Sequence, residues 1–500
     1  MRRLWWLGAL VGCTTGSDTG PWVTLDAVPA PGDWSIAGPG GPGVSFSDSD
    51  LNVPCAWLNG NKDSAEHHNL VTMHDGYLLF PWAPEDGGGG ITFFNFDDPC
   101  NPTKVGEVWA DHMRESHTLA TGQVGGREYL AVDYHVSEEV GGIGFFDITE
   151  PEDPRWVSSL ELPGYHYPDA YFRVALSTTW IGDRLYVPAG LLGVFSIDVS
   201  DPLAPSVIGT VPETGHVVGT FHVIGHLALS SSAGIARILT YDIGDPDDWE
   251  TLSDQQVETE DDPLDNFYFA NIGGEYALFA RKDGAGGPNV YDLRDRSGPT
   301  FAGTLEAPEG DGGYVFRHGD LLFQGESSYG ALYDFPSPDA ISERARFELE
   351  GDLDTVTPIG NVAVVSVDEK GDPGKATGIY PWATAPDTDP PSVKMTVPAD
   401  GEAWAPLSGT VGLSLDEMVE PRSVHAGSFR VWSEHGDAIP GRFYVMEAVT
   451  NFVPDAPLAE DTTYWVEVPA GGIADTSGNP TDETLRFGFS TGAEVIPWPE

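Results

Sequence analysis

The chain has 500 residues, and its 24 basic and 78 acidic side chains give it a formal net charge of −54. This charge repels phosphate backbones and anionic headgroups, so the composition excludes nucleic-acid binding and electrostatic adsorption to anionic membranes. A hydrophobic fraction of 40% is enough for sizeable cores, and 61 Gly with 41 Pro residues predict many tight turns between short strands.

The N-terminus has the pattern of a secretory signal. Two arginines precede the apolar run Leu4–Gly12, which is too short to cross a bilayer as a helix, since a span needs about twenty apolar residues. The ending Leu-Val-Gly-Cys13 resembles the lipobox of bacterial lipoproteins, whose cysteine carries the lipid after cleavage. A hydrophobic N-terminus with an unmodified cysteine is the alternative.

This resemblance implies a signal peptide at residues 1–12, a lipid on Cys13 and an N-terminal tether at residues 13–52. Several acyl chains on one cysteine anchor a protein stably, whereas a single chain is marginal. Because Thr14 rather than Asp follows the cysteine, the resemblance implies an exported protein that is lipid-anchored at the cell outer membrane.

The two other cysteines, Cys55 and Cys100, form an even pair in an exported chain. An oxidising compartment favours a disulfide between them, which would stabilise the fold by about 4 kcal/mol through the loop that it closes. Two free buried thiols are the alternative. Neither cysteine belongs to a CxxC motif, so cysteine catalysis is not expected.

The central part of the chain is an internal repeat. Six segments share an apolar run, a polar residue and, in most copies, an acid–proline turn; they are FFNFDDPCNP, FFDITEPEDP, FSIDVSDPLAP, LTYDIGDPDDW, NVYDLRDRSGP and ALYDFPSPDA. The polar position falls on Asn95, Asp147, Asp198, Asp242, Asp292 and Asp334, and a degraded seventh copy places Pro381 there. The copies recur about every 48 residues.

Each copy predicts four short strands. A first strand precedes a Gly-introduced strand such as residues 182–190, the repeat segment follows, and a fourth strand such as residues 300–307 comes after the turn. Four-stranded units repeated radially form a β-propeller, so residues 53–383 are predicted to be a seven-bladed β-propeller in an all-β chain. The acidic residues of the turns are predicted to accept hydrogen bonds from turn N–H groups.

The stretch GDRLYVPAG…LGVFSIDVSDPLAPSVIGTV resembles the LVIVD-repeat propellers, which are typically exported bacterial proteins. The resemblance is strongest at residues 182–211 and weakens in the later copies, where Arg296 and Ser337 interrupt the Asp-Pro element. It implies the propeller fold and does not specify an activity.

The C-terminal part predicts a second domain. The linker at residues 384–391 is rich in Pro and Asp, residues 392–493 alternate short strands with turns, and residues 494–500 form a tail. The phrases PADG, PLA, TTY, IADTSGNP and FGFST resemble the bacterial Ig-like domain of S-layer and other surface proteins. This resemblance implies an Ig-like β-sandwich that acts as a spacer or adhesive module.

Histidines on the candidate innermost strands raise a metal hypothesis. His68, His117 and His222 would converge at one mouth of the propeller channel and could bind Zn²⁺ or another transition metal. A register change of one residue would turn such side chains to the other face, and histidines that satisfy strand ends by hydrogen bonds are the alternative. At the domain junction, Ca²⁺ is a second option, with candidate ligands Asp387, Asp389, Asp416 and Asp475.

Together these features favour a cell-envelope lipoprotein with a non-catalytic binding or scaffolding role. Its expected partners are the membrane, through the lipid, and an envelope protein or glycan. No cofactor is predicted beyond the Ca²⁺ and Zn²⁺ options. The alternative is a metal-dependent hydrolase or oxidoreductase with a His-lined site at the channel mouth, although HExxH and Walker motifs are missing. A structural envelope component without a specific ligand is the third hypothesis.

Overall fold

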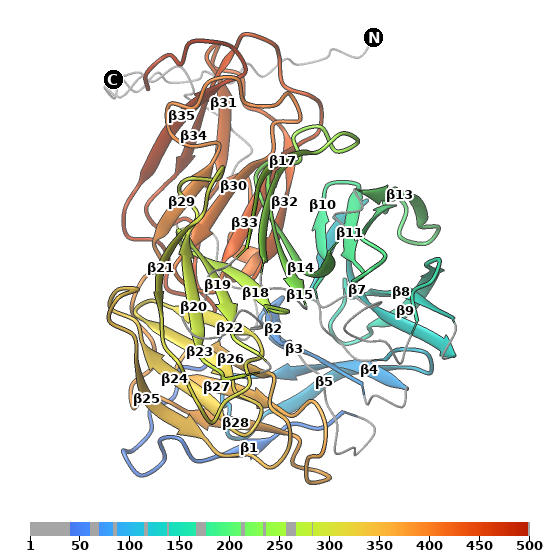
Figure 1. Ribbon diagram of the computed structural model, residues 1–500, viewed down its shortest axis with the longest axis vertical. Coiled ribbons are helices and arrows are strands. Elements are labelled where there is room, and N and C mark those ends of the chain that lie inside the picture. The colour runs from blue at the N-terminus through green and yellow to red at the C-terminus, as the bar shows by residue number, and fades with distance from the viewer. Residues whose placement is uncertain are drawn as a thin grey trace, which may run out of the picture.

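The computed structural model describes residues 41–60, 70–83, 88–114, 119–137, 140–166, 177–211, 216–233, 237–256, 267–282 and 284–498. Within these ranges the chain is all-β, and its helical content is one 3-10 turn, η1 (Pro421–Ser423). The described residues include no helix that is long and apolar enough to span a bilayer. The predicted class, a β-propeller followed by an Ig-like sandwich, is confirmed (Figure 1).

The propeller consists of seven four-stranded antiparallel sheets in the described residues, named sheets 1 to 7 in chain order. Sheets 1 to 3 contain β2 (Thr72–His74), β3 (Tyr77–Trp82), β4 (Gly89–Asn95) and β5 (Thr103–Ala110); β6 (Thr121–Val124), β7 (Arg127–Ser137), β8 (Val140–Asp147) and β9 (Arg155–Glu161); and β10 (Thr179–Ile181), β11 (Arg184–Pro188), β12 (Val194–Asp198) and β13 (Ser206–Val211).

Sheets 4 to 6 repeat this order of strands. They contain β14 (Val217–Ile224), β15 (Leu227–Ala233), β16 (Arg237–Asp242) and β17 (Glu250–Gln256); β18 (Ala270–Gly273), β19 (Tyr276–Ala280), β20 (Pro288–Asp292) and β21 (Thr300–Thr304); and β22 (Val315–His318), β23 (Leu321–Gly325), β24 (Gly330–Asp334) and β25 (Ser342–Phe347). In sheets 1 to 6 the third and fourth strands change register just before the repeat's polar position, which increases the local twist.

Sheet 7 joins the two ends of the propeller. Three of its strands, β26 (Thr355–Ile359), β27 (Val362–Ser366) and β28 (Thr377–Pro381), come from the last repeat, and the fourth, β1 (Ala56–Trp57), comes from the start. Cys55, directly before β1, forms a disulfide with Cys100, which lies in the turn between β4 and β5 of sheet 1. The disulfide therefore links sheet 7 to sheet 1.

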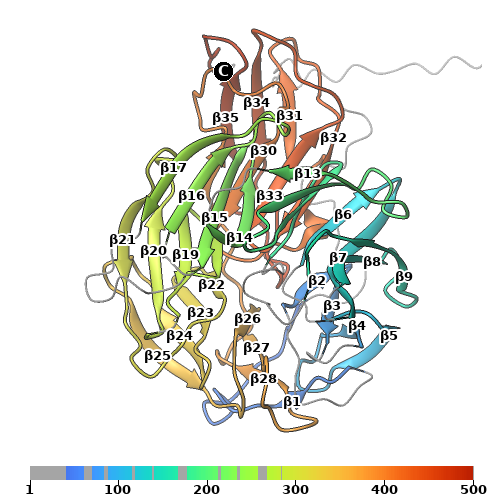
Figure 2. The same ribbon diagram turned by 45° about the vertical axis from the view of Figure 1, so that its right-hand side comes forward.

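Neighbouring sheets bury their apolar faces against one another. Separate clusters join each consecutive pair from sheets 1 and 2 to sheets 6 and 7. A further cluster closes the ring, because Ile359 and Val364 of sheet 7 pack with Phe80 and Trp82 of sheet 1. Figure 2 shows the sheets following one another around the ring, from blue through green and yellow to light orange.

The repeated acidic turns have the structural role that the sequence predicts. Asp198 Oδ1 accepts a hydrogen bond from Ser200 N at 2.9 Å, and Asp242 Oδ1 accepts one from Gly244 N at 2.7 Å. The same side chain-to-turn bond occurs at Asn95, Asp147 and Asp292. Because every one of these oxygens satisfies a local N–H group, the repeat does not constitute an array of catalytic carboxylates.

The Ig-like domain is a two-sheet sandwich. One sheet has the order β29 (Val393–Val397), β30 (Val411–Leu415), β33 (Val449–Pro454) and β32 (Gly441–Met446), and the other has the order β31 (Arg430–Ser433), β34 (Thr463–Val468) and β35 (Leu485–Ser490). Alternating residues from both sheets, including Leu413, Phe452, Val466 and Phe489, form its core.

The end of the expected N-terminal tether packs against sheet 7. Phe46 N donates to Thr384 O at 2.8 Å, Asn52 N donates to Pro381 O at 2.8 Å, and Asn361 Nδ2 donates to Val44 O at 2.9 Å. Residues 44–52 are therefore part of the folded body rather than of a separate tether.

Removing the disulfide tests its contribution to ring closure. In Cys55→Ser/Cys100→Ser we expect the free energy of unfolding to fall by about 4 kcal/mol, because the unfolded chain regains the entropy of an open loop. Denaturant titration measures this loss. Reduced wild type should match the variant, and equal stability of all three samples would contradict a stabilising disulfide.

Candidate functional site

The Ig-like domain covers the face of the propeller formed by the turns between first and second strands. Each of the seven propeller sheets contacts the Ig-like domain at this face. Sheet 1 contributes the ion pair of Asp75 with Arg422, sheet 2 packs β6 against β32, and sheet 7 places Gly360 beside Ser477. Sheets 3 to 6 form hydrogen bonds, which join Gly182 O to Tyr444 Oη, Gly225 N to Asn451 Oδ1, Gly274 N to Leu415 O and Gly319 N to Asp416 O. Ion pairs join the rims, such as Arg296 with Glu402 at 2.6 Å and Arg442 with Asp183 at 2.7 Å. We call this the capped face.

The Ig-like domain approaches the turn between β14 and β15 so closely that only glycine fits at residue 225. Gly225 has a φ of 58°, and a Cβ there would lie 2.2 Å from Val397 O of the Ig-like domain. In both views β30 and β33 lie beside β14 (Figures 1 and 2). The two domains are therefore packed as one body around the propeller axis.

The turn between β32 and β33 brings Glu447 to the centre of the capped face. Glu447 is 5% exposed and accepts a hydrogen bond from the Asn271 side chain on β18. Burial raises the pKa of its carboxyl to about 7. Nearby, Met418 of the Ig-like domain packs with Leu70, Leu119 and Tyr314 from the innermost segments of three sheets. Side chains of both domains thus fill the centre at this end.

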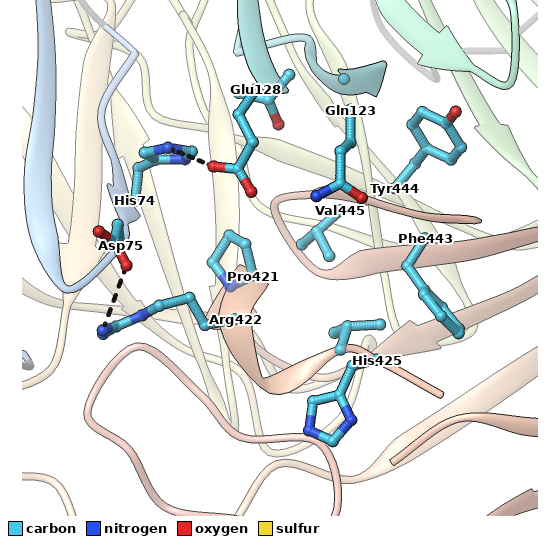
Figure 3. A pocket seen from close by; sticks show the side chains of 13 residues that line it. His74, Asp75, Gln123, Glu128, Pro421, Arg422, His425, Phe443, Tyr444 and Val445 are labelled. Carbon is cyan, nitrogen blue, oxygen red and sulfur yellow. Dashed lines mark ion pairs between the residues drawn. The ribbon is translucent and has the colours of Figure 1, made fainter. Parts of the chain in front are cut away.

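A cavity of about 320 Å³ lies at the seam between sheets 1 and 2 and the Ig-like domain (Figure 3). His74 and Glu128 point toward each other across it, with Nε2 and Oε2 2.9 Å apart. Asp75 points toward Arg422, at 3.8 Å. Phe443, Tyr444, Val445, Gln123 and His425 complete much of the lining.

The charges around this seam cavity compensate one another. Burial would raise the pKa of Glu128, but the hydrogen bond and charge of His74 outweigh burial and lower it. Arg422 also donates to Glu420 Oε1 at 2.9 Å, and Glu420 is fully buried. The ion pairs of Arg422 with Asp75 and Glu420 thus lie at the contact between sheet 1 and the Ig-like domain.

The opposite face carries the loops that join second to third strands and neighbouring sheets, and we call it the loop face. Charged groups from several sheets gather there. Lys282 Nζ of sheet 5 lies 3.5 Å from Asp354 Oδ1 of sheet 7, and both side chains are buried. Burial raises the pKa of Tyr314 far above its usual range, and the carboxylates of Asp354, Asp133 and Glu447 raise it further, the last of them from the capped face.

Two further acidic features belong to the loop face. Glu326 accepts hydrogen bonds from Gly287 N at 3.0 Å and from Tyr333 Oη at 2.5 Å, and burial raises its pKa to about 8. Asp352, Asp368 and Glu369 each place one carboxylate oxygen within 4.8 Å of the others, a spacing that could hold a cation. The loop face therefore combines buried acids with a buried lysine near the propeller axis.

Of the three histidines singled out by the sequence, the structure describes His222 alone. His68 and His117, like Cys13, lie outside the described residues. His222 is 5% exposed, and its Nε2 lies 2.7 Å from Ala270 O of the next sheet, within hydrogen-bond distance. Burial lowers the pKa of His222 to about 4. His222 thus joins sheets 4 and 5 as a neutral side chain, in line with the hydrogen-bonding alternative.

The four junction aspartates have different surroundings. Asp416 Oδ2 binds Lys394 Nζ at 2.9 Å, and Asp475 Oδ1 accepts from Ser477 N at 2.8 Å. Asp389 is exposed. Asp387 is the member that faces two residues the sequence reasoning missed, His318 and Glu417. The sequence offers little to single these two residues out as metal ligands, because His318 ends a strand of the repeat and Glu417 lies among other acidic residues.

A family comparison identifies the C-terminal part of the chain as an Ig-like domain. Residues 387–491 match the bacterial Ig-like domain family. No curated protein matches the chain. Among solved structures, the chain is similar to a protein from Lactobacillus plantarum, with 12% identity, a TM-score of 0.46, and coverage of 58% of this chain and 94% of that one.

Two other solved structures match the chain with similar TM-scores. A periplasmic gluconolactonase from Pseudomonas aeruginosa has 13% identity and a TM-score of 0.43, with 63% of this chain and 88% of that chain covered. The β-propeller domain of Cps50 (Swd1) from Myceliophteria thermophila has 10% identity and a TM-score of 0.43, with 65% and 99% covered. At these scores the similarity assigns no activity.

The buried carboxyl of Glu447 predicts a pH-dependent stability. Its pKa is raised from 4.5 to about 7 by folding, so the folded chain binds the proton more tightly and loses stability as pH rises through this interval. Glu447→Gln stays neutral, so we expect it to be more stable than wild type above pH 7, by about 3 kcal/mol.

Thermal or denaturant unfolding at a series of pH values measures this difference. The advantage of Glu447→Gln should shrink on acidification and vanish below pH 4.5. Glu350→Gln, at an exposed position, is the matched control and should follow wild type throughout. A constant difference across the pH range would show that Glu447 is charged in the folded chain.

Proposed function

We propose that this protein is a cell-envelope lipoprotein with a non-catalytic binding or scaffolding role, and that the loop face is its binding surface. One observation carries the proposal: the Ig-like domain contacts all seven sheets on the capped face. A partner that approaches the propeller along its axis therefore has access from the loop face.

The charge of the loop face supports a partner with cationic or hydrogen-bond-donating groups. Asp352 and Glu369 lie at its surface beside the buried Asp368, and the whole chain carries a net charge of −54. Complementary charge accelerates association and suppresses wrong partners. A basic patch of an envelope protein fits this surface best, and a neutral glycan fits through the hydroxyl groups that it donates to carboxylates.

The envelope location rests on separate support. The lipobox resemblance at Cys13, the LVIVD-repeat resemblance and the match to a bacterial Ig-like domain all suit an exported protein. The Ig-like domain here packs on the propeller, so its proposed role is to brace the propeller rather than to act as a distant spacer.

Charge-neutral substitution on the loop face tests the binding role. We expect Asp352→Asn/Glu369→Gln to weaken saturable binding of the labelled, lipid-free chain to isolated bacterial envelopes by about tenfold, because two half-buried carboxylates of the loop face lose their charge. Sedimentation of the labelled chain with the envelopes, over a range of concentrations, gives the affinity.

The matched control is Asp437→Asn/Glu460→Gln, which removes the same charges from exposed positions of the Ig-like domain. It should bind as wild type does. Equal weakening in both double variants would assign binding to net charge, and non-saturable binding of the wild type would contradict a specific partner.

The anchor is tested by Cys13→Ala. We expect the variant to leave the membrane fraction and to lose incorporation of labelled fatty acid, because its acyl chains provide the membrane affinity. Fractionation of cells that express each form, followed by immunoblotting, measures the change. Cys55→Ser/Cys100→Ser should stay with the membrane; unchanged fractionation of Cys13→Ala would overturn the lipid anchor.

A further inference from the structure

Three parts of the chain meet at one buried polar site. His318 ends β22 in sheet 6, Asp387 lies in the interdomain linker, and Glu417 follows β30 in the Ig-like domain. One ligand atom from each residue lies within 4.8 Å of the other two. The side chains of Asp387 and Glu417 are 7% and 6% exposed.

The imidazole of His318 lies between the two carboxylates. Its Nδ1 is 3.3 Å from Glu417 Oε2, and its Nε2 is 3.6 Å from Asp387 Oδ2. Trp382 packs edge-on against the ring, with centroids 5.3 Å apart, and holds its orientation. A neutral imidazole donates from only one nitrogen, so the lone pair of the other nitrogen also faces an oxygen.

Asp387 provides an independent sign of a missing ligand. Its Oδ1 accepts a hydrogen bond from Asp389 N at 3.1 Å, which fixes the carboxylate, whereas its Oδ2 has no hydrogen-bond partner. An unsatisfied oxygen on a buried carboxylate is costly to the folded state. A bound cation would remove this cost and the repulsion between the neighbouring oxygens.

The neighbouring charged side chains of Lys394, Asp416 and Asp475 have other interaction partners. Lys394 pairs with Asp416 at 2.9 Å, and Asp475 is held by Ser477 and by Asn479, whose Nδ2 donates to its Oδ2 at 2.8 Å. His318, Asp387 and Glu417 are thus the groups of this junction whose ligand atoms lie within 4.8 Å of one another.

We propose that His318, Asp387 and Glu417 form a divalent metal site that ties sheet 6, the linker and the Ig-like domain together. One imidazole with two carboxylates matches Zn²⁺, which accepts nitrogen and oxygen ligands at about 2.0–2.2 Å. Histidine is a poor ligand for Ca²⁺, which prefers oxygen alone. Three protein ligands leave the fourth tetrahedral position of Zn²⁺ open to water, and because they come from β22, the segment between the domains and the Ig-like domain, the ion would hold these parts of the chain together.

Metal retention tests the proposal on the full chain. The purified protein is stripped with a chelator, incubated with Zn²⁺, desalted and measured by elemental analysis. We expect about one bound Zn²⁺ per chain and a higher thermal midpoint than in the stripped protein, since an ion that binds only the folded state stabilises it. Ca²⁺ in place of Zn²⁺ should give neither result.

The variants Asp387→Asn and His318→Gln should each lower the Zn²⁺ affinity by at least about tenfold. Asp387→Asn is the safer variant for folding, because residue 387 lies in the linker. Asp389→Asn, which changes an exposed carboxylate two residues away, is the matched control and should retain the ion as wild type does. Circular dichroism verifies that each variant is folded.

The proposal fails if the wild type retains no Zn²⁺, or if folded Asp387→Asn and His318→Gln retain it as tightly as wild type. Zn²⁺ that is kept by these variants but lost in His68→Ala/His117→Ala would place the ion at the channel mouth and support the enzymatic alternative. None of these measurements uses envelope binding, so loss of the junction site alone leaves the proposed binding role intact, whereas Zn²⁺ at the channel mouth would count against that role.

Discussion

The structure depends on the burial of the apolar faces of the sheets against one another in a closed ring. A single four-stranded sheet of this chain exposes two apolar faces, and only neighbours on both sides can cover them. Closure is therefore obligatory for the first and last sheets. The chain achieves it by giving sheet 7 a strand from the start of the propeller, by packing Phe80 and Trp82 against Ile359, and by the disulfide of Cys55.

The two faces of the ring differ because different connections between strands form them. The tight turns between first and second strands are short and similar, so together they form a regular surface on which a second domain can dock. The Ig-like domain uses backbone hydrogen bonds to several of these turns and inserts Glu447 at the centre. The loop face carries the longer connections between second and third strands and between sheets. Such loops tolerate sequence variation and commonly carry functional residues.

Much of the fold could be predicted from the sequence because its signals are local. The acidic turns, the alternating strands and the glycines between them are decided by nearest neighbours, and the six repeat segments become the third strands of sheets 1 to 6. The site could be predicted only in part. Asp387 was recognised as a candidate ligand, but its partners His318 and Glu417 stand 69 and 30 residues away, and no local pattern links them.

Local sequence patterns were enough to predict the repeat, the strand order within each unit and the presence of a second β domain, and they favoured a disulfide between Cys55 and Cys100 over two free thiols, since periodicity and composition can be read along the chain. Tertiary structure alone decided that His222 bonds to the neighbouring sheet, that the Ig-like domain covers one face of the ring, and that buried carboxylates meet at the junction. These are contacts between distant segments, and docking geometry rather than local propensity sets them.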